Sequence, residues 1–174
     1  MMKKLVPGLI IFAISTNVWA ASVDVEMNQV TPEGIGKSVG NVKISETEKG
    51  LEFTPDLTSL SPGEHGFHIH AKGSCQPALK LGQSSAAESA GGHLDPGYTG
   101  KHEGPEGTGH QGDLPVLVVS QDGRATQSVV APRLKKLDDI KGKALMIHSG
   151  GDNFSDQPKP LGGGGDRIVC GVIK

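Results

Sequence analysis

The sequence predicts an all-β fold, an antiparallel sandwich or barrel, from three observations. Apolar residues occupy every second position in several short segments, the first of which contains Val23, Val25 and Met27. Alternation of this kind places the apolar side chains on one face of a half-buried strand. Turn residues separate the segments, and Asp122-Gly123 stands between two apolar runs, as in a hairpin. Seven or eight short strands of this kind are typical of a sandwich or barrel.

The other expected strands follow in order along the chain. Val42 with Ile44, and Leu51 with Phe53, repeat the alternation of the first segment. The later strands are apolar or β-branched runs bounded by turn residues. They cover residues 114–120, 125–131, 144–148 and 168–173.

Two long loops interrupt the strand pattern, at residues 73–111 and 149–166. Residues 84–90 have a helical composition, and residues 134–140 have apolar positions at helical spacing, but both segments are short. We treat them as parts of loops. Long loops without secondary structure are usually functional in a compact domain, so we expect the chemistry of the molecule there.

The first 20 residues have the pattern of a cleavable secretory signal. Two lysines form a short basic start, an apolar run follows from Leu5 to Ile14, and Ala20 is a small residue suited to signal peptidase. A membrane anchor is the alternative, but this run is shorter than the ~20 apolar residues that a span requires. We therefore expect a signal peptide at residues 1–20 and one exported domain at residues 21–174.

The exported domain is slightly acidic and poor in aromatic residues. Without the two lysines of the signal it has 15 basic and 19 acidic residues, a formal charge of −4, which argues against nucleic acid as a partner. No second apolar stretch is long enough to span a membrane, so we expect no membrane contact after cleavage. Four aromatic residues remain, and the core therefore needs aliphatic side chains and further stabilisation.

Cys75 and Cys170 are a natural source of that stabilisation. Export places them in an oxidising compartment, where a disulfide persists. The bridge would span 95 positions and, in the chain-entropy model, contribute ~4–5 kcal/mol. Two separate buried thiols are the alternative, but a single pair in an exported chain favours the bridge.

Six of the seven histidines stand at spacings that suit metal binding, beginning with His68 and His70. On a strand, residues i and i+2 point to the same face, so both imidazoles can reach one metal while Phe67 and Ile69 turn into the core. His-x-His alone is a weak signal. Two polar residues on the solvent face of a strand are its ordinary alternative.

A second group, His93, His102, His110 and Asp113, lies in a loop rich in glycine and proline. Three nitrogens and one carboxylate oxygen complete a tetrahedral zinc site with no open position, which is typical of a structural site. The metal would order a loop that has no core of its own. A flexible polar loop with incidental histidines is the alternative.

His148 ends the expected strand 144–148. If this strand lies near residues 67–70, His148 can join His68 and His70, and His93 completes a set of four imidazoles suited to Cu(II). His93 would then serve both metals. Zinc has no redox chemistry, so the copper site would carry the electron.

Several motifs together are similar to the copper/zinc superoxide dismutase family, closest to its exported bacterial branch: GFHIH, GGHLDP, KHEGP, GHQGDLP and the ending GGGGDRIVCGVIK. The resemblance covers nearly all of residues 21–174. It implies an eight-stranded Greek-key barrel with one copper and one zinc ion per subunit. It also implies that the protein is a monomer or a homodimer and that it lies in the periplasm. It also implies conversion of superoxide anion to oxygen and hydrogen peroxide.

The resemblance also assigns roles to single residues. It implies the same copper and zinc ligands as above and a disulfide between the two cysteines. Arg167 resembles the arginine beside the copper, and Asp152 the carboxylate that links His68 to His102. His93 would deliver a proton to the product. His65 matches a histidine of the family that is not a ligand, and we interpret it as a hydrogen-bonded structural residue.

The loop at residues 149–166 carries few charges, so guidance of the anionic substrate is expected elsewhere. We select Lys80 as the candidate, because a positive field near a site raises the association rate of an anion. A solvated lysine is the alternative. Residues 162–165 are four glycines, but neither a Gly-Lys-Ser/Thr sequence nor a helix follows, so we interpret them as a tight turn rather than a phosphate loop.

Two other functions compete with dismutation. A non-catalytic protein that binds or delivers copper or zinc would be expected to lack copper ligands or the arginine, and this chain has all of them. A zinc hydrolase needs an open zinc position, and the predicted zinc set is full.

Overall fold

The structure is a computed structural model that describes residues 21–174. The predicted signal peptide, residues 1–20, lies outside the described residues. Most of the described elements are strands, joined by loops that contain three short 3-10 turns. Among residues 21–174, no helix has the length and apolar character needed to cross a membrane.

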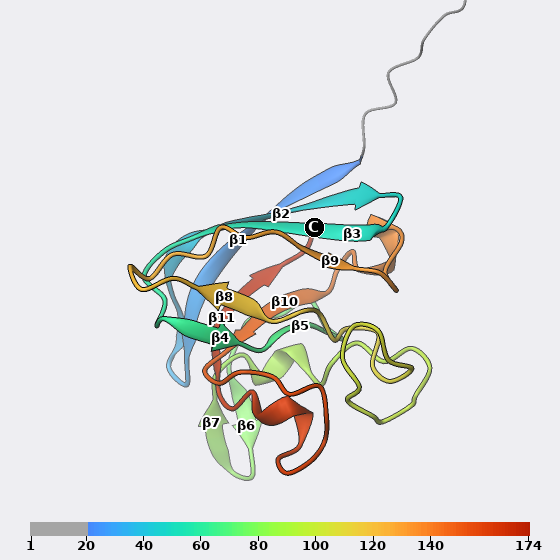
Figure 1. Ribbon diagram of the computed structural model, residues 1–174. Coiled ribbons are helices and arrows are strands. Elements are labelled where there is room, and N and C mark those ends of the chain that lie inside the picture. Colours follow the sequence, from blue (N-terminus) through green and yellow to red (C-terminus); the bar gives the residue numbers. More distant parts are fainter. Residues whose placement is uncertain (1–20) are drawn as a thin grey trace, which may run out of the picture.

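A curled antiparallel sheet of seven strands forms the body of the molecule (Figure 1), in the order β5-β10-β11-β1-β2-β3-β9. The register of its longest pair, β1 with β2, shifts twice beyond Met27. The strands are β1 (Ser22–Thr31), β2 (Gly34–Thr47), β3 (Gly50–Leu57), β5 (Phe67–His70), β9 (Val129–Ala131), β10 (Ala144–His148) and β11 (Arg167–Val172).

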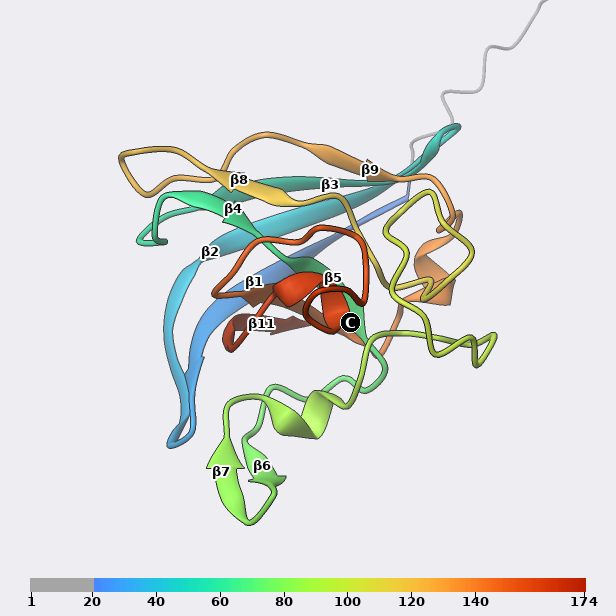
Figure 2. The same ribbon diagram turned by 60° about the horizontal axis from the view of Figure 1, so that its bottom comes forward.

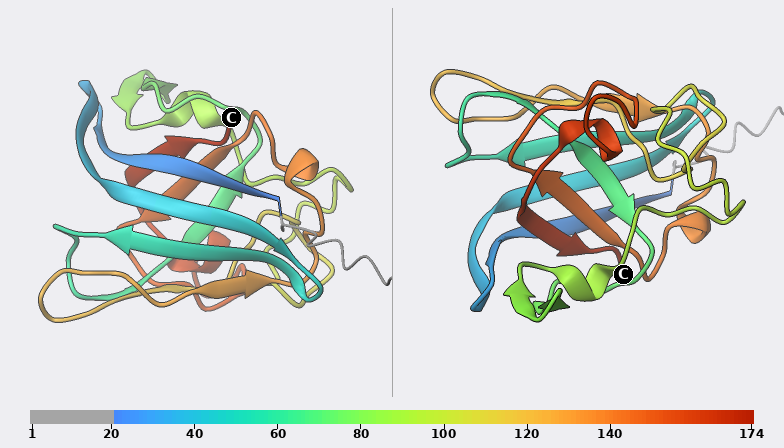
Figure 3. Two further views of the ribbon diagram at one scale, coloured as in Figure 1. Left: turned by 90° about the horizontal axis from the view of Figure 1, so that it is seen from above. Right: turned by 90° about the horizontal axis from the view of Figure 1, so that it is seen from below.

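A second ribbon covers the gap between the two edges of this sheet. β4 (Gly63–His65) pairs with β8 (Leu117–Val119), and isolated bridges join Leu57 to Ala125 and His68 to Asp113. The sheet therefore curls until its two halves face each other, as the two views of Figure 3 show. The predicted all-β antiparallel fold is confirmed. Residues 21–174 contain eleven strands, so the count of eight with Greek-key connections stays a prediction.

The interior is filled by the apolar positions of the alternating strands. Val25, Met27, Val42 and Ile44 are fully buried in one cluster that runs through the barrel. Phe53 belongs to the same cluster and packs edge to face on the aromatic ring of β5, at a centroid distance of 5.8 Å and an interplanar angle of 82°. The aliphatic core predicted from the composition is therefore present.

Strand β5 divides its residues between two sides of the sheet. Phe67 and Ile69 belong to the central cluster, whereas Met146, the neighbour of His68 on β10, belongs to a separate cluster. Because neighbours across an antiparallel pair share a face, His68 and His70 lie on the outside of the barrel. The loops then cover this outer face (Figure 2).

The two predicted loops contain more structure than expected. Residues 73–111 include the hairpin β6 (Ala78–Lys80) and β7 (Gln83–Ser85) and the 3-10 turn η1 (Glu88–Ala90). Residues 149–166 include the turn η3 (Leu161–Gly163), and a third turn, η2 (Leu137–Asp139), follows β9. The hairpin projects from the body at the bottom of Figure 1.

The hairpin predicted around Asp122-Gly123 is wrong. The turn itself forms, because the Ser120 amide donates to the Arg124 carbonyl at 2.8 Å. The flanking strands do not pair with each other, since β8 pairs with β4 and β9 with β3. Each run finds a partner at a different edge of the barrel, and this long-range choice overrides the local turn signal.

The predicted disulfide between Cys75 and Cys170 is present, with a Cα–Cα distance of 5.7 Å and a separation of 95 positions. It fastens the start of the long loop to β11. Both sulfurs pack in the small cluster under that loop. The loop is thus attached to the barrel by a covalent bond.

Candidate metal centre

Four imidazoles meet on the outer face of the barrel. His68 and His70 come from β5, His148 from the end of β10 and His93 from the loop, and their candidate ligand atoms lie within 4.8 Å of one another. Pairing of β10 with β5 places His148 beside this strand, because its amide donates to the Gly66 carbonyl at 2.9 Å. The proximity on which the copper hypothesis depended is therefore present.

Hydrogen bonds decide which ring nitrogen of each imidazole remains available. His70 Nδ1 donates to the Gly91 carbonyl at 2.8 Å and His148 Nδ1 to the Gly165 carbonyl at 3.2 Å. The Nε2 atoms of the same two rings face each other at 3.4 Å. His68 is reversed, because its Nε2 contacts a carboxylate oxygen and its Nδ1 has no hydrogen-bond partner among the described residues.

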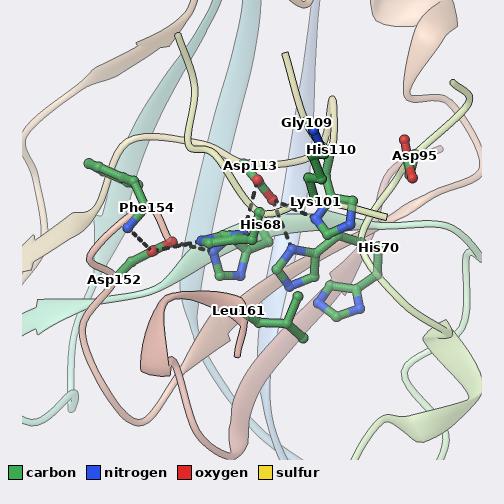
Figure 4. Close-up of polar contacts among 12 residues, drawn as sticks. His68, His70, Asp95, Lys101, Gly109, His110, Asp113, Asp152, Phe154 and Leu161 are labelled. Carbon is green, nitrogen blue, oxygen red and sulfur yellow. Dashed lines mark hydrogen bonds and ion pairs between the residues drawn. The ribbon is translucent and has the colours of Figure 1, made fainter. Parts of the chain in front are cut away.

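A second group surrounds Asp113. Its Oδ1 accepts a hydrogen bond from His93 Nδ1 at 2.8 Å, and its Oδ2 lies 2.9 Å from His102 Nδ1 without hydrogen-bond geometry. His110 Nδ1 is farther away, 3.5 Å from Oδ1. The second group of candidate ligand atoms that lie within 4.8 Å of one another contains His68, not the predicted His110. His110 lies near this group but is not a member of it (Figure 4).

Asp152 joins the two groups from outside. Its Oδ2 accepts from His68 Nε2 at 2.7 Å and its Oδ1 from His102 Nε2 at 2.8 Å. The amide of Phe154 also donates to Oδ1, at 2.8 Å (Figure 4). The Asp152 carboxylate thus accepts hydrogen bonds from the Nε2 atoms of His68 and His102, which lie on the outer side of the site. The Nδ1 atoms of both rings, on the inner side, stay free.

The inner atoms are buried and lack partners among residues 21–174, which tests whether metals fit. Buried polar atoms in proteins are almost always hydrogen-bonded, and an unpaired one costs free energy. Here several are unpaired and all point at the two groups. They are His68 Nδ1, His93 Nε2, His102 Nδ1, His110 Nδ1 and Asp113 Oδ2. Nitrogens and a carboxylate oxygen of this kind fit copper and zinc ions.

Burial keeps the copper-side imidazoles neutral. It lowers the pKa of His70 and of His148 well below the usual value, and it also lowers the pKa of His68. Burial and the neighbouring His68 lower the pKa of His93 to about 4. A neutral imidazole carries a lone pair that a metal can accept, so these four rings are ready to bind a metal at neutral pH.

His102 has the opposite electrostatic environment. Burial alone would lower its pKa, but the carboxylates of Asp113 and Asp152 on either side of the ring raise it to about 9. Burial would likewise raise the pKa of Asp113, yet the neighbouring His102 and His93 hold it well below its usual range. The two carboxylates therefore favour a positive charge at this part of the site, which a bound metal ion would supply.

Arg167 lies at the edge of the four-imidazole group. It pairs with His148 in the register of β10 and β11. Its guanidinium donates to the carbonyl of Ala87 at 2.6 Å and to that of Gly91 at 2.7 Å. Gly91 also accepts the hydrogen bond of His70, so one carbonyl oxygen positions both a candidate ligand and the arginine.

Comparison with known proteins supplies the family. The model of the family described as copper/zinc superoxide dismutase (SODC) matches residues 38–173. The chain belongs to the copper/zinc superoxide dismutase family. It is 68% identical to superoxide dismutase [Cu-Zn] of Escherichia coli strain K12, over 99% of this chain and 100% of that protein.

Solved structures of family members agree with the fold. The Cu/Zn superoxide dismutase from Brucella abortus superposes with a TM-score of 0.87 at 54% identity, over 88% of this chain and 100% of that one. The monomeric copper, zinc superoxide dismutase from Salmonella enterica gives a TM-score of 0.81 at 72% identity, with the same coverage. The predicted family is confirmed.

Lys80, selected as a possible steering residue in this superoxide dismutase family member, lies on the β6–β7 hairpin. Its side chain is 60% exposed, and its Nζ lies 3.7 Å from Glu88 Oε2. Lys80 and Arg167 line one cavity of about 390 Å³. The structure therefore places both cationic side chains at the same cavity.

The four glycines at residues 162–165 allow the chain to approach side chains of the site closely, a role that was not predicted from the sequence. Gly162 has a φ of +68° and lies so close to Asp152 and His102 that a Cβ atom would overlap both side chains. Gly164 lies against the ring of His148, and Gly165 supplies its acceptor. The sequence signal for this role was the run of four consecutive glycines in a loop that was predicted to be functional.

His65 is buried and lies outside both groups of the superoxide dismutase site. Its Nδ1 donates to the backbone carbonyl of His148 at 2.6 Å, and its Nε2 lies 2.8 Å from the carbonyl of Ser61. These contacts agree with its interpretation as a hydrogen-bonded structural residue.

Proposed function

We propose that this chain removes superoxide in the periplasm by dismutation, with specific histidines holding each metal. Membership of the family carries the reaction class: the chain is an oxidoreductase, a copper/zinc superoxide dismutase that uses one copper ion and one zinc ion per subunit. The single observation that supports the site best is the set of buried, unpartnered ligand atoms on the outer face of the barrel. The residue assignments follow from it.

We assign copper to His68, His70, His93 and His148. Hydrogen bonds occupy the other nitrogen of His68, His70 and His148, which leaves one nitrogen of each ring directed inward. Fixing one ring nitrogen sets the orientation and basicity of the other. Four neutral imidazoles suit copper better than a hard cation.

We assign zinc to His93, His102, His110 and Asp113. The two nitrogens of His93 face opposite groups, with Nδ1 toward Asp113 and Nε2 unpartnered on the copper side. His93 can therefore serve both metals. We prefer His110 to His68 as the fourth zinc ligand, because His110 Nδ1 is buried without a partner and lies 3.5 Å from Asp113.

When bound, copper would exchange one electron with each of two superoxide anions while zinc keeps its charge and orders the loop. The chain supplies the rest of the chemistry. Arg167 presents a fixed cation with hydrogen-bond donors to the anionic substrate, and two loop carbonyls keep its guanidinium in place. His93 Nε2 is an unpartnered nitrogen at the copper side. When it is not bound to copper, it would hold a proton and pass it to the departing peroxide.

We propose that Lys80 contributes to the capture of superoxide, because it shares the cavity with Arg167. Glu88 offsets part of its charge. The test is the variant Lys80→Ala, with kcat/KM measured against ionic strength. We expect a lower rate and a weaker salt dependence, and an unchanged rate with an unchanged salt slope would refute the steering role.

Metal reconstitution tests the proposed function. The mature protein is stripped with a chelator, and copper, zinc or both are added back before superoxide removal is measured. We expect activity only with copper present, and a large loss in Arg167→Ala, which removes the cation but none of the proposed ligands. Full copper occupancy without activity would instead support the alternative, a protein that binds or delivers metal.

Export and subunit state are also parts of the proposal. The N-terminal pattern supports cleavage after Ala20 and a periplasmic location, which fractionation and N-terminal sequencing of the mature protein would test. We propose a monomer rather than a homodimer, because the Salmonella enterica relative is described as monomeric. Light scattering would contradict this if it gave the mass of two subunits.

A further inference from the structure

We call residues 93–113, which contain the four proposed zinc ligands, the zinc loop. A short turn of the second loop, residues 152–156, lies directly on residues 102–104 of the zinc loop. Asp152 is one of its anchors, through the ring of His102. Two further residues of the same turn reach the zinc loop and were assigned no role by the sequence. They are Asp156, through a backbone hydrogen bond, and Phe154, through its ring.

Asp156 connects the two loops through their main chains. Its Oδ2 accepts from the amide of His102 at 3.0 Å, and its Oδ1 accepts from the amide of Leu161 at 3.1 Å. These two hydrogen bonds hold the pKa of the carboxyl below its usual value. One carboxylate thus fixes the backbone of His102 while Asp152 fixes its ring, and the residue is held at both ends.

Phe154 covers the next part of the zinc loop. A Cβ atom at Gly104 would lie 2.7 Å from Cγ of the Phe154 ring, so ring and glycine are in direct contact. Phe154 has a φ of +56°, a conformation that non-glycine residues seldom adopt. Its amide is fixed on Asp152, and its side chain extends from this corner of the site in Figure 4. A bulky residue in this conformation requires compensation from its contacts, and the ring on Gly104 provides one.

We propose that Phe154 and Asp156 are positioning residues that hold the zinc ligand His102 from outside the site and thereby slow the release of zinc. This inference rests on the proposed assignment of His102 to zinc. The zinc loop has no core of its own, so its ligands stay in place only through contacts with other segments. Residues 152–156 supply those contacts at His102, and zinc release requires the zinc loop to separate from them.

The experiment measures zinc transfer from the mature, copper- and zinc-loaded protein to a chromogenic chelator. Phe154→Ala and Asp156→Asn should each release zinc about tenfold faster, the lower end of the effect of removing a residue that orients a metal ligand. With cobalt in place of zinc, both variants should also shift the visible absorption bands of the metal. Phe154→Met, which retains an apolar cover, should restore the slow rate.

Matched controls separate this effect from general loss of structure. Tyr98→Ala removes an aromatic residue from the zinc loop itself that is 93% exposed and also has a positive φ, of +51°. Asp122→Asn removes a carboxylate that contacts only its own turn. Both should release zinc at the wild-type rate. Phe154→Gly permits the positive φ without strain, so it folds readily yet should still release zinc rapidly.

Two results would count against the inference in different ways. If Phe154→Ala and Asp156→Asn release zinc within twofold of the wild-type rate while His102→Ala loses zinc, the positioning role is refuted and the zinc assignment stands. If His102→Ala binds zinc as tightly as the wild type, the assignment of His102 itself is refuted, and the positioning role is refuted with it.

Discussion

At the scale of single residues, the types and spacings of the candidate ligands were visible in the sequence, but the orientation of their rings was not. His68 and His70 are two positions apart on a strand, which is enough to predict a shared face. The nitrogen that each ring leaves free depends on distant acceptors, Gly91 for His70 and Asp152 for His68. Only the fold brings these acceptors to the rings.

Asp152→Asn tests the carboxylate that joins the two groups. An amide offers one acceptor where the carboxylate offers two, so either His68 or His102 loses its outer hydrogen bond. We expect a loss of roughly 10–100-fold in zinc affinity, measured by competition with a chelator. The control is Asp56→Asn, an exposed carboxylate that contacts only Arg124. Equal zinc affinity in the two variants would contradict this role of Asp152.

Gly162→Ala tests the close approach of the glycine run. The methyl group would overlap Asp152 and His102, in addition to the strain of a φ of +68°. We expect a loss of about 2–4 kcal/mol in the free energy of unfolding, from strain and overpacking together, and weaker zinc binding. Gly82→Ala is the matched control, because Gly82 has a φ of +83° but nothing within 4 Å of a Cβ atom. Denaturant unfolding should show about 1–2 kcal/mol for it.

At the scale of secondary-structure elements, alternation was a better guide than turn chemistry. It located β1, β2 and β3, since one face of each strand is more buried than the other and the period of two follows from that burial. The turn at Asp122-Gly123 was located correctly, yet the pairing on either side was not. Strand partners are chosen by contacts across the barrel, which a local pattern does not contain.

The disulfide links one element to another, and substitution of its two cysteines removes this link. The double variant Cys75→Ala, Cys170→Ala frees the loop from β11. For a separation of 95 positions, the chain-entropy model predicts a loss of about 4–5 kcal/mol in the free energy of unfolding. Guanidinium unfolding of the metal-free protein measures it. A loss below about 1 kcal/mol would mean that the bridge contributes little to stability.

At the scale of the whole molecule, the barrel and the metal centre are separate layers. The central cluster fills the interior, and the histidines lie outside it beneath two loops. The aliphatic core and the all-β class were therefore predictable without any knowledge of the metals. The depth at which the histidines are buried was not, because it depends on how the loops fold over them.

This burial predicts how the stability of the metal-free protein depends on pH. The pKa values of His68, His70, His93 and His148 are lowered in the folded state, so unfolding takes up protons below about pH 6.5. The free energy of unfolding should fall as the pH decreases from 7 to 5, by up to about 1.4 kcal/mol per pH unit for each histidine.

The same molecule should also lose stability at alkaline pH, for the opposite reason. The pKa of His102 is raised to about 9, so its contribution is complete below pH 6.5 and is lost as the pH rises through 9. Denaturant unfolding of the metal-free protein at several pH values should place the maximum near pH 7. Stability that increases steadily from pH 7 to pH 5 would contradict the neutral state of the four buried imidazoles.

The division of β5 between two sides of the sheet limits how the gene can change. Phe67 and Ile69 face the core, and His68 and His70 face the candidate metal centre. A strand has a side-chain period of two, so a shift by one residue exchanges its faces. One codon inserted or deleted at the start of β5 would turn both imidazoles inward and both apolar side chains outward. We therefore expect a change in the length of this strand to be more damaging than a single substitution within it, because it would displace all four side chains at once.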